Sequence, residues 1–178
     1  MIRRILCPTD LTENSRNSVA YAFRLAKEND AGLVVFHATV FPDCNRYLCE
    51  LELYSQSQWE ECVSRFKMDQ IVADAERKVK SFVGAKFKAE AGAVDWKPRV
   101  GLGKVSEEII VAAFQEEVDL IVMARCKRAM LARLLRSSIT ETVSTGAPCP
   151  VLSIDTTQFV GRSAGWRVPL LREFFQTS

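Results

Sequence analysis

The sequence predicts an α/β fold, an open five-stranded parallel sheet with helices on both faces. Three observations predict it. Short apolar runs of strand length alternate along the chain with segments whose apolar residues recur at three- and four-residue steps, the period of a helix. The run at 33–38 is nearly continuous in apolar residues, as expected for a strand covered on both faces. Residues 119–155 form a strand–loop–helix–strand pattern, and such alternation is typical of parallel sheets.

Length and composition fit one globular domain. The chain has 178 residues, 48% hydrophobic and 26% charged, and a domain has roughly 150 residues. The net charge of +2 is too small to attract nucleic acid or a membrane surface through the overall field. No apolar run approaches the ~18–20 residues of a membrane helix, and the apolar stretch at the N-terminus is too short for a secretory signal. We therefore expect a cytoplasmic protein whose partners are neither membranes nor nucleic acids.

The first part of the pattern is a strand, a helix and a second strand. Pro8 ends the first apolar run, and the polar residues that follow it suit a turn and a helix cap. The helix carries an apolar stripe at helical spacing and stops before Gly32. The expected elements are a strand at 3–8, a turn at 9–12, a helix at 14–29 and a strand at 33–38.

The middle of the chain begins with an irregular segment. Pro42, Asp43 and Asn45 break any periodicity within 39–56. Apolar residues then recur at helical steps, which predicts a long helix over 57–82. The remaining expected elements of this part are a third strand within 87–100 and a turn at 101–103.

The last part repeats the alternation. Ser137 or Ser138 suits the N-cap of the final helix, because a short hydroxyl side chain can accept a hydrogen bond from an exposed backbone N–H. Residues 1–155 therefore form the predicted domain. Residues 156–178 are a C-terminal extension with a short amphipathic helix expected near 169–175, which covers either its own domain or a partner subunit. The expected elements are a helix at 105–117, a strand at 120–123, a helix at 138–145 and a strand at 151–154.

Four stretches in this order and spacing resemble the universal stress protein family. They are an apolar strand ending in Pro-Thr-Asp (5–10), an apolar strand ending in histidine (33–37), Val-Gly followed by Glu-Ile-Ile and Asp-Leu-Ile-Val-Met (within 100–123), and Ala-Pro-Cys-Pro before the last strand (147–152). The resemblance spans about 1–155. It implies a Rossmann-like sheet of the adenine nucleotide alpha hydrolase-like type, and it implies a dimer.

Nucleotide-binding members of that family resemble one another in a pattern of Gly, two residues, Gly, nine residues, Gly, then Ser or Thr. The matching positions here are Ala124, Lys127, Ser137 and Ser138, so only the final hydroxyl residue is kept. Glycine lets backbone N–H groups approach phosphate oxygens closely and permits positive φ. The chain therefore resembles a divergent member that lacks the glycine motif, and we expect no ATP bound in the usual way.

An anionic ligand held by side chains is the alternative. The loop carries Arg125, Lys127 and Arg128, with further arginines up to position 136, and the helix that begins near Ser138 directs its N-terminus towards the loop. The same residues also fit a solvated basic face. On this alternative, ATP or another adenine nucleotide is the cofactor.

Two further positions complete the candidate binding site. Asp10 follows the first strand, and the resemblance implies that it lies near the base and ribose of a nucleotide, whereas a short carboxylate there equally suits a cap of the turn. Ala38, at the end of the second strand, is the other candidate contact. His37 precedes it and is interpreted as a packing or turn residue, since no nucleophile or metal set accompanies it.

We expect the cysteines to be mainly packing residues. In a reducing cytosol, disulfides are not expected, and Cys7 and Cys149 lie in apolar strand-like runs. Cys44, Cys49 and Cys62 are close enough in sequence to form a thiol cluster. The sequence holds neither a Cys-x-x-Cys pair nor a second histidine, so we expect no metal site.

Three functional hypotheses follow. The first, which we favour, is a non-catalytic stress-response or regulatory protein that acts as a homodimer through contacts with unknown protein partners. The second is a nucleotide- or anion-binding switch that uses Asp10, the basic loop 125–136 and Ser138. The third is a thiol-based redox-responsive protein. The homodimer hypothesis also draws on the apolar last strand, because an uncovered strand at the edge of a sheet invites pairing.

Overall fold

The computed structural model describes residues 1–39, 68–125 and 139–155. Most of the irregular segment 39–56, the first part of the helix expected from 57, the basic loop after Arg125 and the C-terminal extension lie outside the described residues. The described elements are β1 (Arg4–Pro8), α1 (Glu13–Asn29), β2 (Gly32–Thr39), α4 (Met68–Lys86), α5 (Lys88–Ala91), β3 (Trp96–Leu102), α6 (Val105–Gln115), β4 (Leu120–Arg125), α7 (Ile139–Gly146) and β5 (Val151–Asp155).

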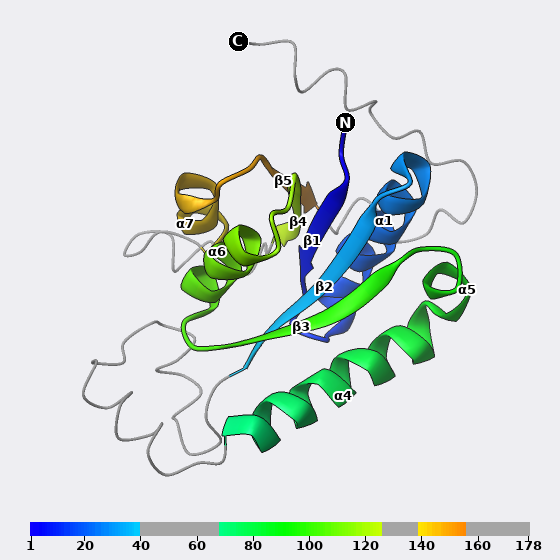
Figure 1. Cartoon of the computed structure of the whole chain (residues 1–178), viewed down its shortest axis with the longest axis horizontal. Coiled ribbons are helices and arrows are strands. Elements are labelled where there is room, and N and C mark those ends of the chain that lie inside the picture. The colour runs from blue at the N-terminus through cyan, green and yellow to red at the C-terminus, as the bar shows by residue number, and fades with distance from the viewer. Residues whose placement is uncertain (40–67, 126–138, 156–178) are drawn as a thin grey trace.

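The strands form one parallel sheet in the order β3-β2-β1-β4-β5, which confirms the predicted five-stranded parallel architecture. The strand order reverses at β1. The chain first adds β2 and β3 on one side of β1, and it then adds β4 and β5 on the other side. Figure 1 shows the sheet between two layers of helices. In sheets of this kind ligands bind at the carboxyl ends of the strands, next to the point of reversal. A binding site is therefore expected at the carboxyl ends of β1 and its neighbouring strands.

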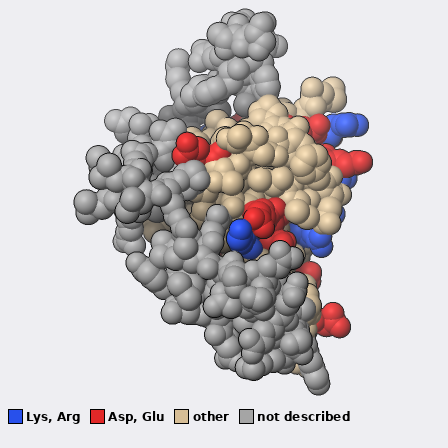
Figure 2. Space-filling model, turned by 90° about the vertical axis from the view of Figure 1, so that its left-hand side faces the viewer, with Lys and Arg blue, Asp and Glu red and all other residues tan. Residues whose placement is uncertain are grey.

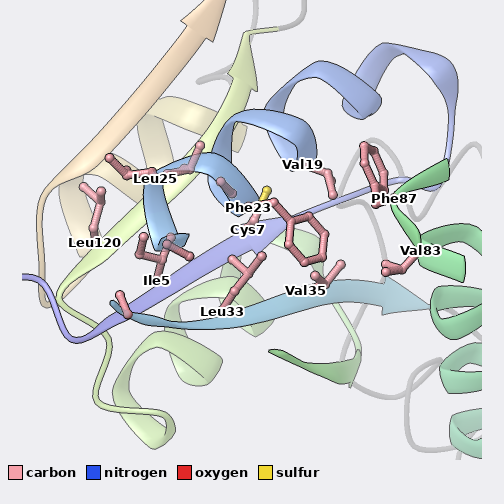
Figure 3. Packing of buried hydrophobic residues seen from close by; sticks show 14 of the residues in the cluster. Ile5, Cys7, Val19, Phe23, Leu25, Leu33, Val35, Val83, Phe87 and Leu120 are labelled. Carbon is pink, nitrogen blue, oxygen red and sulfur yellow. The ribbon is translucent and has the colours of Figure 1, made fainter. Parts of the chain in front are cut away.

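The alternating side chains of the strands build a core on each face of the sheet. Ile5 and Cys7 of β1 face the core beneath α1 and α4, whereas Leu6 between them faces the core beneath α6 and α7. Figure 3 shows the first core, in which Phe23 of α1 and Phe87 lie close together with ring centroids 5.7 Å apart. Both faces are covered because successive strand residues point to opposite sides.

Helix α1 begins and ends where the polar residues predict. The Thr12 hydroxyl accepts a hydrogen bond from the Asn14 N–H, at 3.2 Å. At the other end Asp30 has a left-handed backbone with φ 50°, and its N–H reaches the carbonyl of Ala26. These two caps satisfy backbone groups that a helix leaves without partners at its ends. The Thr12 cap also belongs to the turn that leads from β1 into the helix.

The region between α4 and β3 differs from the prediction. Helix α4 runs to Lys86, past the expected end at 82, and α5 follows it, so that β3 (Trp96–Leu102) occupies only the last part of the expected range 87–100 and extends past it. Phe87 lies between the two helices. Its N–H donates to the Val83 carbonyl, and its ring is buried in the first core. The expected range 87–100 therefore includes a short helix and a turn before the strand.

The face that carries α6 and α7 is largely uncharged where it is described (Figure 2). Val111 and Phe114 of α6 and Ile139 of α7 are exposed there. The two helices touch closely, since a Cβ on Gly146 would lie 2.7 Å from the Ile110 side chain. Among the described helices, none is both long and apolar enough to cross a membrane.

Candidate functional site

The candidate site lies where β1, β2 and β4 end at the carboxyl edge of the sheet. Asp10 follows β1, Ala38 lies at the end of β2 and Ala124 lies at the end of β4. The Thr9 N–H donates to the Phe36 carbonyl at 2.8 Å, which joins the first two of these ends directly. The structure thus places three of the predicted site residues along one edge. The backbone of Arg125 ends β4 there, while Lys127, Arg128, Ser137 and Ser138 lie outside the described residues.

Asp10 caps the turn between β1 and α1. Its Oδ1 accepts hydrogen bonds from the backbone N–H of Thr12, at 3.0 Å, and from the Thr12 hydroxyl, at 2.7 Å. Burial raises the pKa of Asp10, but the hydrogen bonds from Thr12 and its neighbours outweigh it, so the pKa lies below its usual value. The capping role is therefore present in the structure, and contact of this exposed carboxylate with a nucleotide stays a prediction.

The turn that carries Asp10 is held by buried hydroxyl groups. Thr9 Oγ1 lies 2.7 Å from Ser15 Oγ and accepts a hydrogen bond from the Leu11 N–H at 3.0 Å. Leu11 itself has φ 61°, a conformation that is costly for a branched side chain, while it packs against the first core. Sequence reasoning missed this network, although the hydroxyl residues Thr9 and Ser15 flank the predicted turn at 9–12 and could have indicated it.

His37 fastens the end of β2 to the end of β1. Its Nδ1 lies 2.8 Å from the Thr9 carbonyl oxygen and must donate to it, so the neutral ring carries its proton on Nδ1. Burial lowers the pKa of His37 below its usual value, and the charge of Lys78 adds to this effect, whereas Thr9 and Asp10 act in the opposite direction. The ring is thus neutral at pH 7 and holds two strand ends together. This contact fits the predicted packing or turn role.

Ala38 pairs in the sheet with Gly101 of β3, next to a half-buried carboxylate. A Cβ on Gly101 would lie 2.6 Å from Glu108 Oε2 and 2.7 Å from the ring of Phe36, and one on Gly103 would lie 2.8 Å from Glu108 Oε1. Burial raises the pKa of Glu108, although the backbone N–H of Leu102 donates to its carboxylate. The two glycines therefore make room for Glu108, a residue of this edge that sequence reasoning did not single out.

Ala124 occupies an ordinary strand position. It pairs with Ile154 of β5 and is half-buried. Among the described residues other than glycine, only Leu11, Asp30 and Glu117 have positive φ, so the backbone of Ala124 needs no glycine. The first position of the expected glycine pattern is therefore part of the sheet here.

The described cysteines are packing residues. Cys7 is fully buried in the first core, and burial raises the pKa of its thiol to about 12. Cys149 is half-buried, and burial together with the charge of Asp119 raises its thiol pKa to about 11. Both thiols are therefore protonated and unreactive at neutral pH. Cys44, Cys49 and Cys62 lie outside the described residues. Across 1–39, 68–125 and 139–155, no group of three or more His, Cys, Asp or Glu side chains is arranged to hold a metal ion.

Several known proteins are similar to this chain in sequence or in fold. The universal stress protein MJ0531 of Methanocaldococcus jannaschii is 28% identical over 154 residues, which cover 86% of this chain and 82% of that protein. The solved structure of universal stress protein UspA from Lactobacillus plantarum superposes with a TM-score of 0.56 at 22% identity and covers 86% of this chain and 97% of that one. A universal stress protein solved in complex with cAMP superposes with a TM-score of 0.55 at 20% identity, covering 87% and 98%.

These solved structures share the fold of this chain. The family model described as the universal stress protein family matches residues 1–154. The match includes β1 to β4 and all but the last residue of β5. The chain therefore belongs to the universal stress protein family.

Proposed function

We propose that this chain is a stress-response or regulatory protein that acts as a homodimer through protein contacts, performs no catalysis and binds no ATP through the usual glycine loop. Family membership supports the stress-response role. The pairing of the dimer and the absence of standard ATP binding are inferred from particular residues of the sheet.

The dimer proposal rests on the difference between the two outermost strands of the sheet, β3 and β5. Among the described strands β3 pairs only with β2, and it contains Pro98, which lacks a backbone N–H, between the charged Lys97 and Arg99. Proline and charge are the usual protection of an edge strand. At the other edge, 151–154 of β5 contains neither. We infer that β5 is the strand through which two copies pair.

The hydrogen-bonding direction of β5 can be deduced from one contact. The Pro150 carbonyl accepts a hydrogen bond from the Ile121 N–H at 3.0 Å, so the backbone of residue 150 faces β4. Because successive residues of a strand direct their backbone groups to opposite sides, those of Val151 and Ser153 face away from β4. These N–H and C=O groups are the ones that a second copy would use.

Sedimentation velocity tests the dimer. The wild-type chain is expected to sediment as a dimer, and Ser153→Pro, which removes one outward N–H and leaves the β4 pairing intact, is expected to shift it to the monomer. Ser153→Ala is the matched control, because it removes the hydroxyl and keeps the N–H. Thermal unfolding confirms that each variant is folded. A monomeric wild type, or a Ser153→Pro variant that stays dimeric, contradicts the proposal.

The absence of standard ATP binding is supported by the ends of β1 and β4. Ala124 is a regular strand residue where nucleotide-binding members have glycine, and Lys127 and Ser137 replace the other two glycines. Asp10 Oδ1 already accepts two hydrogen bonds from Thr12. Denaturing purified protein and analysing the supernatant by anion-exchange chromatography is expected to yield no stoichiometric nucleotide. One ATP or ADP per chain, or a micromolar Kd for either, overturns this part of the proposal.

A switch that binds an adenine nucleotide or another anion is the second candidate function. The observation that favours it is the exposed Asp10 carboxylate, ionised at neutral pH at the carboxyl edge, in a fold that a neighbour solved with cAMP shares. Isothermal titration with cAMP and AMP tests it. Binding that is lost in Asp10→Asn and kept in Asp30→Asn, a change at an exposed helix end, supports the switch. If the wild type and both variants release the same heat on titration with cAMP and AMP, the switch hypothesis is wrong.

A further inference from the structure

Three cationic side chains gather around the C-terminal end of α6, beside the amino ends of β1 and β3 and opposite the candidate site. Lys97 Nζ lies 2.6 Å from Glu116 Oε2. Arg4 Nη1 donates to the Glu116 carbonyl oxygen at 2.5 Å, and Arg99 Nη2 donates to Gln115 Oε1 at 2.6 Å. The Glu116 side chain is only 13% exposed. Lys97 therefore pairs with the Glu116 carboxylate, whereas Arg4 and Arg99 donate to neutral oxygens at the end of α6.

Two of these cations compete for Glu116. Lys97 holds the carboxylate, while Arg99 Nε lies 3.8 Å from Glu116 Oε1, which is too long for a hydrogen bond. Arg99 Nε is also buried and has no hydrogen-bond partner. A buried donor without an acceptor is unfavourable. A group that took Lys97 away from Glu116 would therefore allow Glu116 to move onto Arg99 and satisfy that donor.

A pocket of about 140 Å³ lies next to this cluster. Arg4 and Lys97 line it together with the first residues of β2 and the backbone at the start of β3, where Asp95 contributes one opposing charge. Its walls are the hydrogen-bonded starts of two strands, since the Leu33 N–H donates to the Asp95 carbonyl at 2.8 Å. The pocket is thus rigid on one side and cationic on the other.

We propose that this pocket binds a phosphate-type oxyanion through Lys97 and Arg4. Both cations are already held beside the pocket by Glu116, so little side-chain ordering is needed on binding. When the oxyanion accepts hydrogen bonds from Lys97, Glu116 exchanges that partner for Arg99 Nε. The exchange leaves each cation paired, and it ties the occupancy of the amino edge to the last turn of α6.

Titration of the full chain with inorganic phosphate at constant ionic strength, followed by amide NMR shifts, tests the site. Saturable shifts are expected at 32–34 and 95–97. Lys97→Gln is expected to weaken binding at least tenfold, whereas Glu116→Gln is expected to tighten it, because the competing carboxylate is removed. A purely structural network would not give these opposite signs. Lys88→Gln, a charge change on exposed α5, is the control and should bind as the wild type does.

The outcomes are distinct from those of the nucleotide switch. No saturable shift at the amino edge, or equal affinity in Lys97→Gln and Lys88→Gln, overturns the proposal. Shifts confined to the carboxyl edge near Asp10 also overturn it. A parallel titration with glycerol 3-phosphate separates two sources of the same group: tighter binding of the ester assigns the pocket to a phosphorylated small molecule, and tighter binding of inorganic phosphate assigns it to the free ion.

Discussion

The imidazole Nδ1 of His37 lies 2.8 Å from the Thr9 carbonyl oxygen, and this contact joins the ends of two neighbouring strands at the carboxyl edge. Replacing His37 by Leu leaves the Thr9 carbonyl without this donor and is expected to lower the free energy of unfolding by about 1–2 kcal/mol. Asn is the matched control, because its amide nitrogen can take the place of Nδ1. Urea denaturation measures both variants, and equal losses for Leu and Asn would show that the hydrogen bond contributes nothing.

His37 also predicts a pH dependence. Burial lowers its pKa in the folded chain below the usual 6.5, so the unfolded chain binds a proton more readily. The stability that comes from the neutral ring is therefore fully present above about pH 6.5 and is lost as the pH falls towards the folded pKa. Between pH 7.5 and 5 the wild type is expected to lose more stability than His37→Asn. Parallel curves for the two proteins over this range would contradict the assignment.

Local sequence signals predicted the elements whose ends are set by neighbouring residues. The turn at 9–12 and its caps are of this kind, since Asp10 and Thr12 bond to backbone groups within two residues. The sheet followed from alternation, because both of its faces need covering. The edge position of 151–154 is now given by the strand order, and the pairing of two copies there is still a prediction.

Signals that depend on distant partners were not visible in the sequence. The range expected for the third strand starts at Phe87, whereas in the fold the Phe87 N–H bonds to the Val83 carbonyl and its ring packs against Phe23. Gly101 was interpreted as part of a turn, whereas it is a strand residue that pairs with Ala38. Because Gly101 has no side chain, it leaves room for the side chain of Glu108, which is seven residues further on and in another element. Such requirements arise from the assembled fold.

The Cys7 thiol is expected to be inert in the folded chain. Its pKa is raised to about 12 by complete burial, so almost no thiolate exists at neutral pH. Iodoacetamide labelling of native protein followed by peptide mass spectrometry should leave Cys7 unmodified, and labelling in denaturant should modify it fully. Rapid labelling of Cys7 in the native chain would mean that the first core opens readily. The unfolded sample is its own control, because it contains the same six cysteines.

Asp119 ties the start of β4 to the start of β1. Its Oδ2 accepts hydrogen bonds from the backbone N–H groups of Arg3, at 2.7 Å, and Arg4, at 2.9 Å, and the first of these is the main reason that its pKa is lowered. Asp119→Ala is expected to cost about 1 kcal/mol at pH 7, since the site is open to solvent. The loss should shrink as the pH falls from the usual value of 3.8, where the unfolded carboxyl takes up a proton, towards the lower pKa of the folded chain.

Asp95→Ala, an exposed change near the same edge of the sheet, is the control for Asp119. It should leave the free energy of unfolding within about 0.5 kcal/mol of the wild type. Equal losses for the two variants would show that the hydrogen bonds to Arg3 and Arg4 do not distinguish Asp119 from any surface carboxylate.

The contact between Glu108 and Gly101 gives the most specific prediction. Gly101→Ala is expected to destabilise the chain by about 1–3 kcal/mol, because the new methyl group would collide with Glu108 and with the Phe36 ring. Glu108→Ala removes one of the two obstacles, so the double variant should recover part of the loss. A double-mutant cycle by urea denaturation measures this coupling, and strictly additive losses would contradict the contact.

Glu108→Gln separates the charge of this side chain from its shape. Burial raises the pKa of Glu108, so the folded chain prefers the protonated form, and the ionised carboxylate costs stability as the pH rises through its folded pKa. Gln keeps an acceptor for the Leu102 N–H without the charge. The variant is therefore expected to be more stable than the wild type at pH 7, by less than about 1 kcal/mol because the group is only half-buried. This difference should vanish below about pH 4.3, where the unfolded carboxyl also becomes protonated. A variant that is less stable at pH 7 would instead mean that the charge of Glu108 strengthens its bond to the end of β3.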